Sequence, residues 1–353
     1  MIDYLVLSTE ITIYEALDIK EKMALEVYNK AEAYTKEYKS KGITKLGIWI
    51  DLDSILEEPN VKNCTLNVTV NARQFCKSGS LDAEKVLNTL AEILVNIETQ
   101  DVIWRVQNIS FAYTLQGSYA KEYIGLLNGG KSMSGIGIRK EVDNSKSPRR
   151  LEYISKGMRL KFSYDKNTDS LAISLWLLKQ KVGTLAERYG IKKREFISYA
   201  KCMKELEWYL WCDYLKRISG MEAYYSFKHA ESIIDATDGS KAEKENMKNV
   251  LKGVAAYKGV ENYMSHVTDA NPPYEFMKSI HTVDTARKYI SLLAKAGINP
   301  VVLSRRYAQE NNIHYIPNLI TVLEGQDITR YRIVRVKSNT QNTDLREDNL
   351  PFD

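Results

Sequence analysis

The sequence predicts an α+β protein, with an antiparallel sheet in its N-terminal part and a mainly helical C-terminal part. Short runs of alternating polarity follow one another between Gly135 and Tyr189, which is typical of neighbouring antiparallel strands. From Lys192 onward, apolar residues recur at helical spacing instead. The 353 residues are enough for two domains, and we expect these over residues 1–190 and 191–337. A disordered acidic tail is expected over residues 338–353.

The composition excludes several classes of protein. A net charge of +5 and a pI near 8.7 describe a mildly basic chain, which is compatible with nucleic-acid binding. The four cysteines form no CxxC pair, so neither a zinc knuckle nor a disulfide framework is indicated. The first residues lack the basic start and long apolar core of a signal peptide, and no apolar run reaches membrane-spanning length. We therefore expect a soluble cytoplasmic protein that binds no membrane.

The N-terminal elements follow from periodicity. Asp82 is the expected N-cap of the second helix, because a carboxylate there accepts free backbone N–H groups. The expected strands are 4–7, 46–54, 64–75 and 101–115, and the expected helices are 15–38, 81–97 and 118–128, with Ser118 capping the last and Gly129 and Gly130 ending it.

The central stretch predicts four more strands. The segment from Asp165 to Ser170 is rich in turn-forming residues, so the last two strands should form a hairpin. These strands are expected over 136–142, 151–154, 160–164 and 171–177.

The C-terminal part contains aromatic residues on a helix expected over 191–219. Trp208, Tyr209, Trp211 and Tyr214 at this spacing favour a packed interface over a base-stacking surface. If the chain had no DNA role, this helix could instead be a partner-binding surface.

Further along, helices are expected over 248–266, 282–295 and 300–310, and strands over 314–323 and 329–337. The last two helices and two strands match a winged helix-turn-helix, with Arg305 and Arg306 on the second helix. An ordinary helical hairpin is the alternative.

A phosphate-loop pattern also occurs. Gly125, Gly130, Lys131 and Ser132 match GxxxxGK[ST]. A phosphate loop needs a strand before the glycines and a helix after them, and here a helix precedes and a strand follows. A nucleotide-binding enzyme is therefore kept only as an alternative.

Basic residues surround two tyrosines in the central stretch. A basic sheet could hold a phosphodiester, and Tyr153 or Tyr164 could attack it, with Lys156 or Lys166 nearby. Asp51 and Asp53 could bind a divalent ion, since hard cations take oxygen ligands. The expected DNA-binding residues are Arg105, Arg139, Lys140, Arg149, Arg150, Arg159, Lys161, Arg305 and Arg306.

Several segments follow one another along the chain in a familiar order: MIDYLVLS, CTLNVTVNARQF, VIWRVQNISFAYTL with EYIGLL, SLAISLWLLKQKVGTLAERYG, and TARKYISLLAKAGINPVVLSRR with IPNLITV. This order resembles that of the replication initiation proteins of filamentous phages and rolling-circle plasmids.

This resemblance implies a nickase-like N-terminal domain that acts on single-stranded or hairpin origin DNA, together with host replication proteins. In that family a tyrosine joins a 5′ phosphate with the help of a divalent metal, Mg²⁺ or Mn²⁺. Tyr164 and Lys166 have the family's Tyr-x-Lys spacing, whereas Tyr153 lies closer to Arg149 and Arg150.

Two family carboxylates are replaced, by Gln107 and by Ser174. The chain is therefore expected to be either an active nickase or an inactive DNA-binding relative. In the first case Asp51, Asp53, Glu152 or Asp165 would rebuild the metal site.

Overall fold

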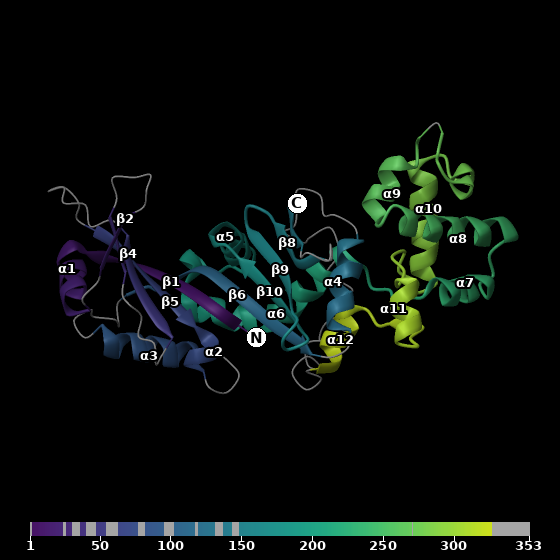
Figure 1. Ribbon diagram of the computed structural model, residues 1–353. Coiled ribbons are helices and arrows are strands. Elements are labelled where there is room, and N and C mark those ends of the chain that lie inside the picture. Colours follow the sequence, from purple (N-terminus) through teal and green to yellow (C-terminus); the bar gives the residue numbers. More distant parts are fainter. Residues whose placement is uncertain are drawn as a thin grey trace.

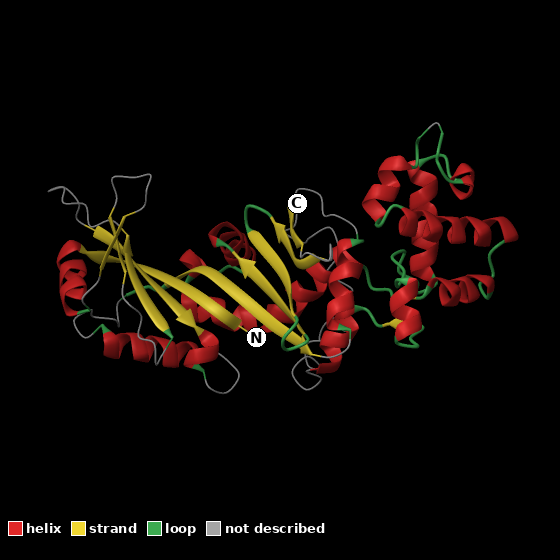
Figure 2. Ribbon diagram, in the orientation of Figure 1, coloured by secondary structure: helices red, strands yellow, loops and turns green. Residues whose placement is uncertain are grey.

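The fold is built on one antiparallel sheet of ten strands (Figures 1 and 2). The computed structural model describes residues 2–23, 26–29, 36–39, 47–53, 63–76, 82–94, 102–116, 119–130, 137–142, 148–269 and 271–326. The strands follow the order β2-β3-β4-β5-β1-β6-β10-β9-β8-β7. Their bounds are β1 Ile2–Thr12, β2 Glu26–Asn29, β3 Lys36–Lys39, β4 Ile48–Asp53, β5 Asn63–Asn71, β6 Arg105–Gln116, β7 Gly137–Val142, β8 Pro148–Ile154, β9 Met158–Asp165 and β10 Ser170–Leu177.

The two halves of this sheet share one topology. In each half a long strand is followed by a helix and then by four strands, the last of which pairs with the first. The halves meet where β1 pairs with β6, and Leu5 lies opposite Ile109 at this seam. Leu5 also pairs with Val70 of β5, and Ile109 pairs with Leu177 of β10. Leu5 of the first half is therefore equivalent to Ile109 of the second half, and Val70 is equivalent to Leu177.

Helices cover one face of the sheet. On that face α3 (Ala83–Ile93), α4 (Ala120–Asn128) and α6 (Phe196–Ser219) bury the apolar residues of the strands. Trp211 of α6 packs edge-on against Tyr113 of β6, with ring centroids 5.3 Å apart. The predicted packing role of the α6 aromatic residues is confirmed for Trp208, Trp211 and Tyr214, which are buried, whereas Tyr209 is only partly buried. The remaining helices of this part are α1 Ile13–Lys22, α2 Ala72–Phe75, α5 Lys179–Arg188 and η1 Lys192–Arg194.

The helix predicted over 15–38 is wrong in length. α1 begins at a capping box, in which the Thr12 and Glu15 side chains each bond to the other residue's backbone N–H, and it ends at Lys22. The chain then forms β2 and β3, which extend the sheet from β4. Pairing with an existing strand edge overrides the helical propensity of this segment.

Two smaller differences concern element ends. The strand predicted over 64–75 ends at Asn71, whose side chain caps α2. Tyr119, not Ser118, precedes α4 and makes no side-chain cap bond; Ser118 lies outside the described residues. Asp82 caps α3 as predicted, since its side chain accepts the N–H groups of Glu84 and Lys85. The four central strands and the hairpin between β9 and β10 are also confirmed.

The helical part follows α6, which itself packs on the sheet beyond the predicted boundary at residue 190 (Figure 1). The chain enters this part through β11 (Tyr224–Tyr225) and leaves it through β12 (Tyr315–Ile316), which pairs with β11. It then returns to pack α12 (Leu319–Gln326) against α6. The elements between are α7 Phe227–Asp235, α8 Lys241–Ala256, α9 Val260–His266, η2 Glu275–Ser279, α10 Val283–Lys295 and α11 Arg305–Glu310.

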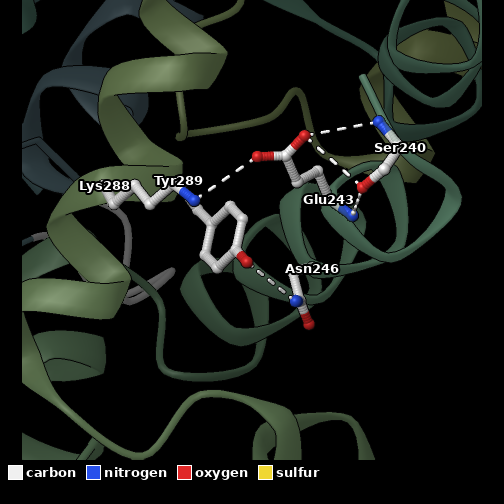
Figure 3. Close-up of polar contacts among 5 residues, drawn as sticks. All are labelled: Ser240, Glu243, Asn246, Lys288 and Tyr289. Atoms are coloured by element: carbon white, nitrogen blue, oxygen red, sulfur yellow. Dashed lines mark hydrogen bonds and ion pairs between the residues drawn. The ribbon is translucent and has the colours of Figure 1, made fainter.

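Helices α8 and α10 are joined by polar contacts (Figure 3). Glu243 completes the capping box of α8 with Ser240, and it also pairs with Lys288 of α10 at 3.3 Å. Asn246 donates a hydrogen bond of 2.9 Å to the Tyr289 hydroxyl. The single helix predicted over 248–266 is instead split into α8 and α9, because Lys258 and Gly259 have positive φ angles.

The predicted winged helix-turn-helix is wrong in two of its parts. Residues 300–304 are not helical, so α11 has only six residues. Leu319–Gln326 is a helix, so the first wing strand is reduced to the two residues of β12. An apolar run such as LITVL fits either a strand or a helix, and packing on α6 decides between them. The second wing strand and the predicted tail lie outside the described residues. In the described part of the chain, no helix has the length and apolarity to span a membrane.

Candidate nucleic-acid interface

Basic residues line the sheet face that lies opposite α3, α4 and α6, which we call the open face. Arg150 of β8 and Arg159 and Lys161 of β9 alternate with the buried Leu151, Leu160 and Phe162, so all three point to the open face. Lys161 lies opposite Glu152, and Arg159 lies opposite Ile154. Arg150 approaches Glu152 at 3.7 Å. These three predicted DNA-binding residues therefore form one basic row.

Tyr153 lies on the other face of β8. Its side chain is 1% exposed, and its hydroxyl donates a hydrogen bond of 3.3 Å to the Leu127 carbonyl of α4. Burial raises the pKa of this hydroxyl well above its usual range. Tyr153 is therefore a core residue and does not face a bound phosphodiester, which corrects its prediction as a candidate nucleophile.

Tyr164 lies at the end of β9 and is only partly buried. Its hydroxyl donates a hydrogen bond of 2.8 Å to Asp169 in the turn before β10. Burial, and then the bond to Asp169, raise the pKa of Tyr164. Lys166 is exposed in the same turn. The structure therefore brings Tyr164 and Asp169 together, with Lys166 in the same turn. Lys156 is exposed in the turn before β9, at the opposite end of that strand.

The predicted metal ligands lie far from Tyr164 in the sheet. Asp51 and Asp53 lie on β4, five strands from β9 in the sheet order, which is roughly 24 Å at about 4.8 Å per strand. Asp51 faces the open side, and the Asp53 side chain lies outside the described part. Among the described residues, no three His, Cys, Asp or Glu side chains gather as metal ligands do. The described carboxylates therefore do not fit a divalent metal beside Tyr164.

The carboxylates suggested as substitute ligands have other roles. Asp165 accepts hydrogen bonds of 2.9 Å from the Asn167 N–H and from the Thr168 hydroxyl, which stabilise the hairpin turn. These bonds lower the pKa of Asp165. Glu152 accompanies Arg150 on the open face.

Gln107 and Ser174 both lie on the open face. A bulge in β6 places Gln107 beside Ser8, to whose hydroxyl its amide donates. Arg194 donates a hydrogen bond of 3.1 Å to the Gln107 side-chain oxygen. Nearby, Arg105 pairs with Glu10 at 3.0 Å, so this predicted DNA-binding residue is partnered.

The sequence did not predict an aromatic pair that lies on the open face. Tyr4 of β1 and Trp176 of β10 both lie opposite Ser110 of β6, and their rings stack over this residue with centroids 5.6 Å apart. Asn71 donates a hydrogen bond of 3.3 Å to the Tyr4 hydroxyl. The two rings are separated by 172 positions in the chain, so no local pattern could have paired them. Alternation in β10 alone does place Trp176 on the polar side.

The other predicted site residues are dispersed. Arg139 and Lys140 lie on β7 and Arg149 on β8, with side chains outside the described part. Arg305 and Arg306 are exposed on α11, where Arg306 pairs with Glu310 at 2.8 Å.

The phosphate-loop pattern has a packing explanation. Gly125 lies inside α4, and a Cβ atom at Gly130 would lie 2.6 Å from the Ile218 carbonyl oxygen. Gly130 is therefore required for close packing of α4 against α6. Lys131 and Ser132 lie outside the described residues.

No protein-family model and no curated protein matches the chain. Among solved structures, faint similarity is found to BexL and DynU16, among others. BexL, the di-domain ARO/CYC of the BE-7585A biosynthetic pathway, is 8% identical, with 58% of this chain and 93% of BexL covered at a TM-score of 0.22. DynU16, from the dynemicin biosynthetic locus, is 11% identical, with 57% and 98% covered at a TM-score of 0.17. Scores this low support no argument about fold or function.

Proposed function

We propose that this chain is a DNA-binding protein of the replication-initiation type and that the open face holds single-stranded or hairpin DNA. The basic row of Arg150, Arg159 and Lys161, on the same face as the Tyr4–Trp176 pair, is the observation that carries the proposal. Cations that neutralise phosphates release counterions, and aromatic rings stack on unpaired bases of any sequence. The resemblance to phage and plasmid initiators supports the replication role.

Salt-dependent binding tests this function. The variant Arg150→Gln/Arg159→Gln/Lys161→Gln should bind a fluorescent single-stranded oligonucleotide more weakly. Its slope of log affinity against log salt should fall by about 2, at about 0.7 per lost phosphate contact. The control variant Lys241→Gln/Arg287→Gln/Lys295→Gln removes the same charge from exposed positions of α8 and α10 and should bind like the wild type. Equal behaviour of the two variants would contradict the proposal.

DNA nicking by Tyr164 is a second candidate function, favoured by its hydrogen bond to Asp169. An adjacent general base, here a carboxylate, is one way in which a nucleophile is activated for covalent catalysis. The Tyr164 oxygen would bond to phosphorus, the bond from phosphorus to the 3′ oxygen would break, and Asp169 would take the tyrosine proton. The leaving 3′ oxygen would take a proton from water. Because Tyr164 lies on the helix-covered side of β9, DNA would have to reach it around the end of the β9–β10 hairpin.

A nicking assay with Mg²⁺ or Mn²⁺ separates the active from the inactive form. If the protein is a nickase, a nick with a covalent adduct should disappear in Tyr164→Phe and decrease in Asp169→Asn. It should persist in Tyr153→Phe, since that residue is buried. DNA binding without a nick would instead define an inactive relative, in which Gln107 and Ser174 replace the metal ligands of active members. Chelation of the metal before the assay tests whether a divalent ion is required.

A further inference from the structure

A groove of about 1060 Å³ lies at the junction of the sheet and the helical part, away from the open face. Its walls come from α4, the start of α7, the end of α8 and the segment that contains α11. Figure 1 shows α11 between α4 and α7. The groove thus joins segments that are far apart in the sequence.

The groove is positively charged. Lys228, Lys258 and Arg305 line it with exposed side chains, and none of the three forms an ion pair with a residue that the structure describes. Glu122 is the one carboxylate among the described lining residues. Burial raises the pKa of Glu122, but the three cations outnumber this one carboxylate even when it is ionised. The surplus of unpaired cations suits an anionic ligand with several charges.

A cluster of four aromatic rings adjoins the groove through His314, which is one of its lining residues. His314 stacks on His229, with centroids 5.6 Å apart, and His229 stacks on Tyr225 at 5.4 Å. Tyr315, which is 54% exposed, contacts Tyr225 at 5.8 Å. The pairing of β11 with β12 and a hydrogen bond of 2.8 Å from the Ser226 N–H to the His314 carbonyl hold the cluster in place.

We propose that this groove is a second binding site for single-stranded nucleic acid, separate from the open face. The three cations would contact backbone phosphates, and the ring cluster would stack unpaired bases. The presence of both cations and aromatic rings favours a single strand of nucleic acid over a free anion, because a phosphate alone would not contact the rings. The inference takes its nucleic-acid partner from the proposed function, but it rests on its own residues.

Cross-linking distinguishes this site from the open face. A single-stranded oligonucleotide containing 4-thiothymidine would be irradiated with the full chain, and the linked peptides identified by mass spectrometry. Links within residues 225–229 or 303–315 are the expected result. Links confined to the strands that carry Tyr4, Trp176 and Lys161 would overturn the groove and leave the proposed function standing. Links confined to the groove would support the groove site and contradict DNA binding by the open face. If no links formed, both proposals would be overturned.

Paired variants sharpen the test. Lys228→Gln/Arg305→Gln should lower the salt slope of oligonucleotide binding by about 1.4, whereas the control Lys241→Gln/Lys295→Gln should leave it unchanged. Tyr315→Ala changes an exposed side chain, so the fold should persist, and it should weaken binding about 5-fold or more with an unchanged slope. Wild-type affinity and slope in these groove variants would overturn the proposal. Equally effective competition by a mononucleotide would overturn its assignment to a strand.

Discussion

The two halves of the sheet share their strand order but differ in the chemistry of their open face. Register defines the equivalent positions, because Leu5 and Ile109 at the seam pair with Val70 and Leu177. Three residues before Val70, Asn67 lies opposite Asp51 of β4.

At the equivalent place in the second half, Ser174 lies opposite Lys161 of β9. The same topology thus presents a carboxylate in one half and an ammonium group in the other. Strand order decides where a side chain is displayed, and the residue displayed there decides what the surface can bind.

The buried face shows the opposite behaviour, since both halves place large apolar residues at equivalent positions. Leu7 of β1 lies two residues after Leu5, and Phe111 of β6 lies two residues after Ile109. Both side chains are 0% exposed. The two halves therefore contribute to one continuous core across β1 and β6.

The largest expected effect comes from breaking that core. Phe111→Ala should lower the free energy of unfolding by about 3–5 kcal/mol and Leu7→Ala by about 2–5 kcal/mol, through lost burial and the cavity left behind. If the halves form one cooperative unit, urea unfolding should remain a single transition in both variants. Intrinsic tryptophan fluorescence, to which Trp49 of the first half and Trp176 of the second half both contribute, would report it. Two separate transitions would show that the halves unfold independently.

The sequence predicts the second half better than the first. Clean alternation identified β7, β8, β9 and β10 and the turn at Asp165, because each strand there pairs with its neighbour in the chain. β2 and β3 were missed, since they add to a sheet edge that the local sequence does not reveal.

The candidate site also has a part that the sequence could predict and a part that it could not. The prediction kept Tyr153 in the basic site as a candidate nucleophile. Alternation within β8 and β9 would have been enough to place it on a different face from Arg159 and Lys161. The stacking of Tyr4 on Trp176 depends on β6 lying between β1 and β10, and that is decided by tertiary pairing alone.

A charge exchange between equivalent positions has the next largest expected effect. Under the proposed function, Lys161→Asp should weaken oligonucleotide binding by about 10-fold, because it replaces a phosphate partner by a repulsive charge. Asp51→Lys should strengthen binding, since it extends the basic surface into the first half. Fluorescence anisotropy at two salt concentrations measures both variants. If the two changes shift affinity in the same direction, the polarity assigned to the two halves is wrong.

The smallest expected effect concerns tyrosine burial, which also differs between the halves. Tyr153 of the second half is buried against α4, whereas Tyr14 of the first half is 82% exposed. Tyr153→Phe removes the hydrogen bond to Leu127 and should lower the free energy of unfolding at pH 7 by about 1 kcal/mol. Tyr14→Phe should change it by less than about 0.5 kcal/mol.

The pH dependence gives this last comparison a sign. Burial raises the pKa of Tyr153 in the folded state, whereas the pKa of an unfolded tyrosine is about 10. The folded chain therefore binds more protons above pH 10, and the stabilisation from a neutral buried tyrosine is complete below that pH and is lost as pH rises further. Urea unfolding at pH 7 and pH 11 should show the deficit of Tyr153→Phe shrinking at the higher pH. A deficit that stays constant would mean that the Tyr153 hydroxyl is not buried as a neutral group.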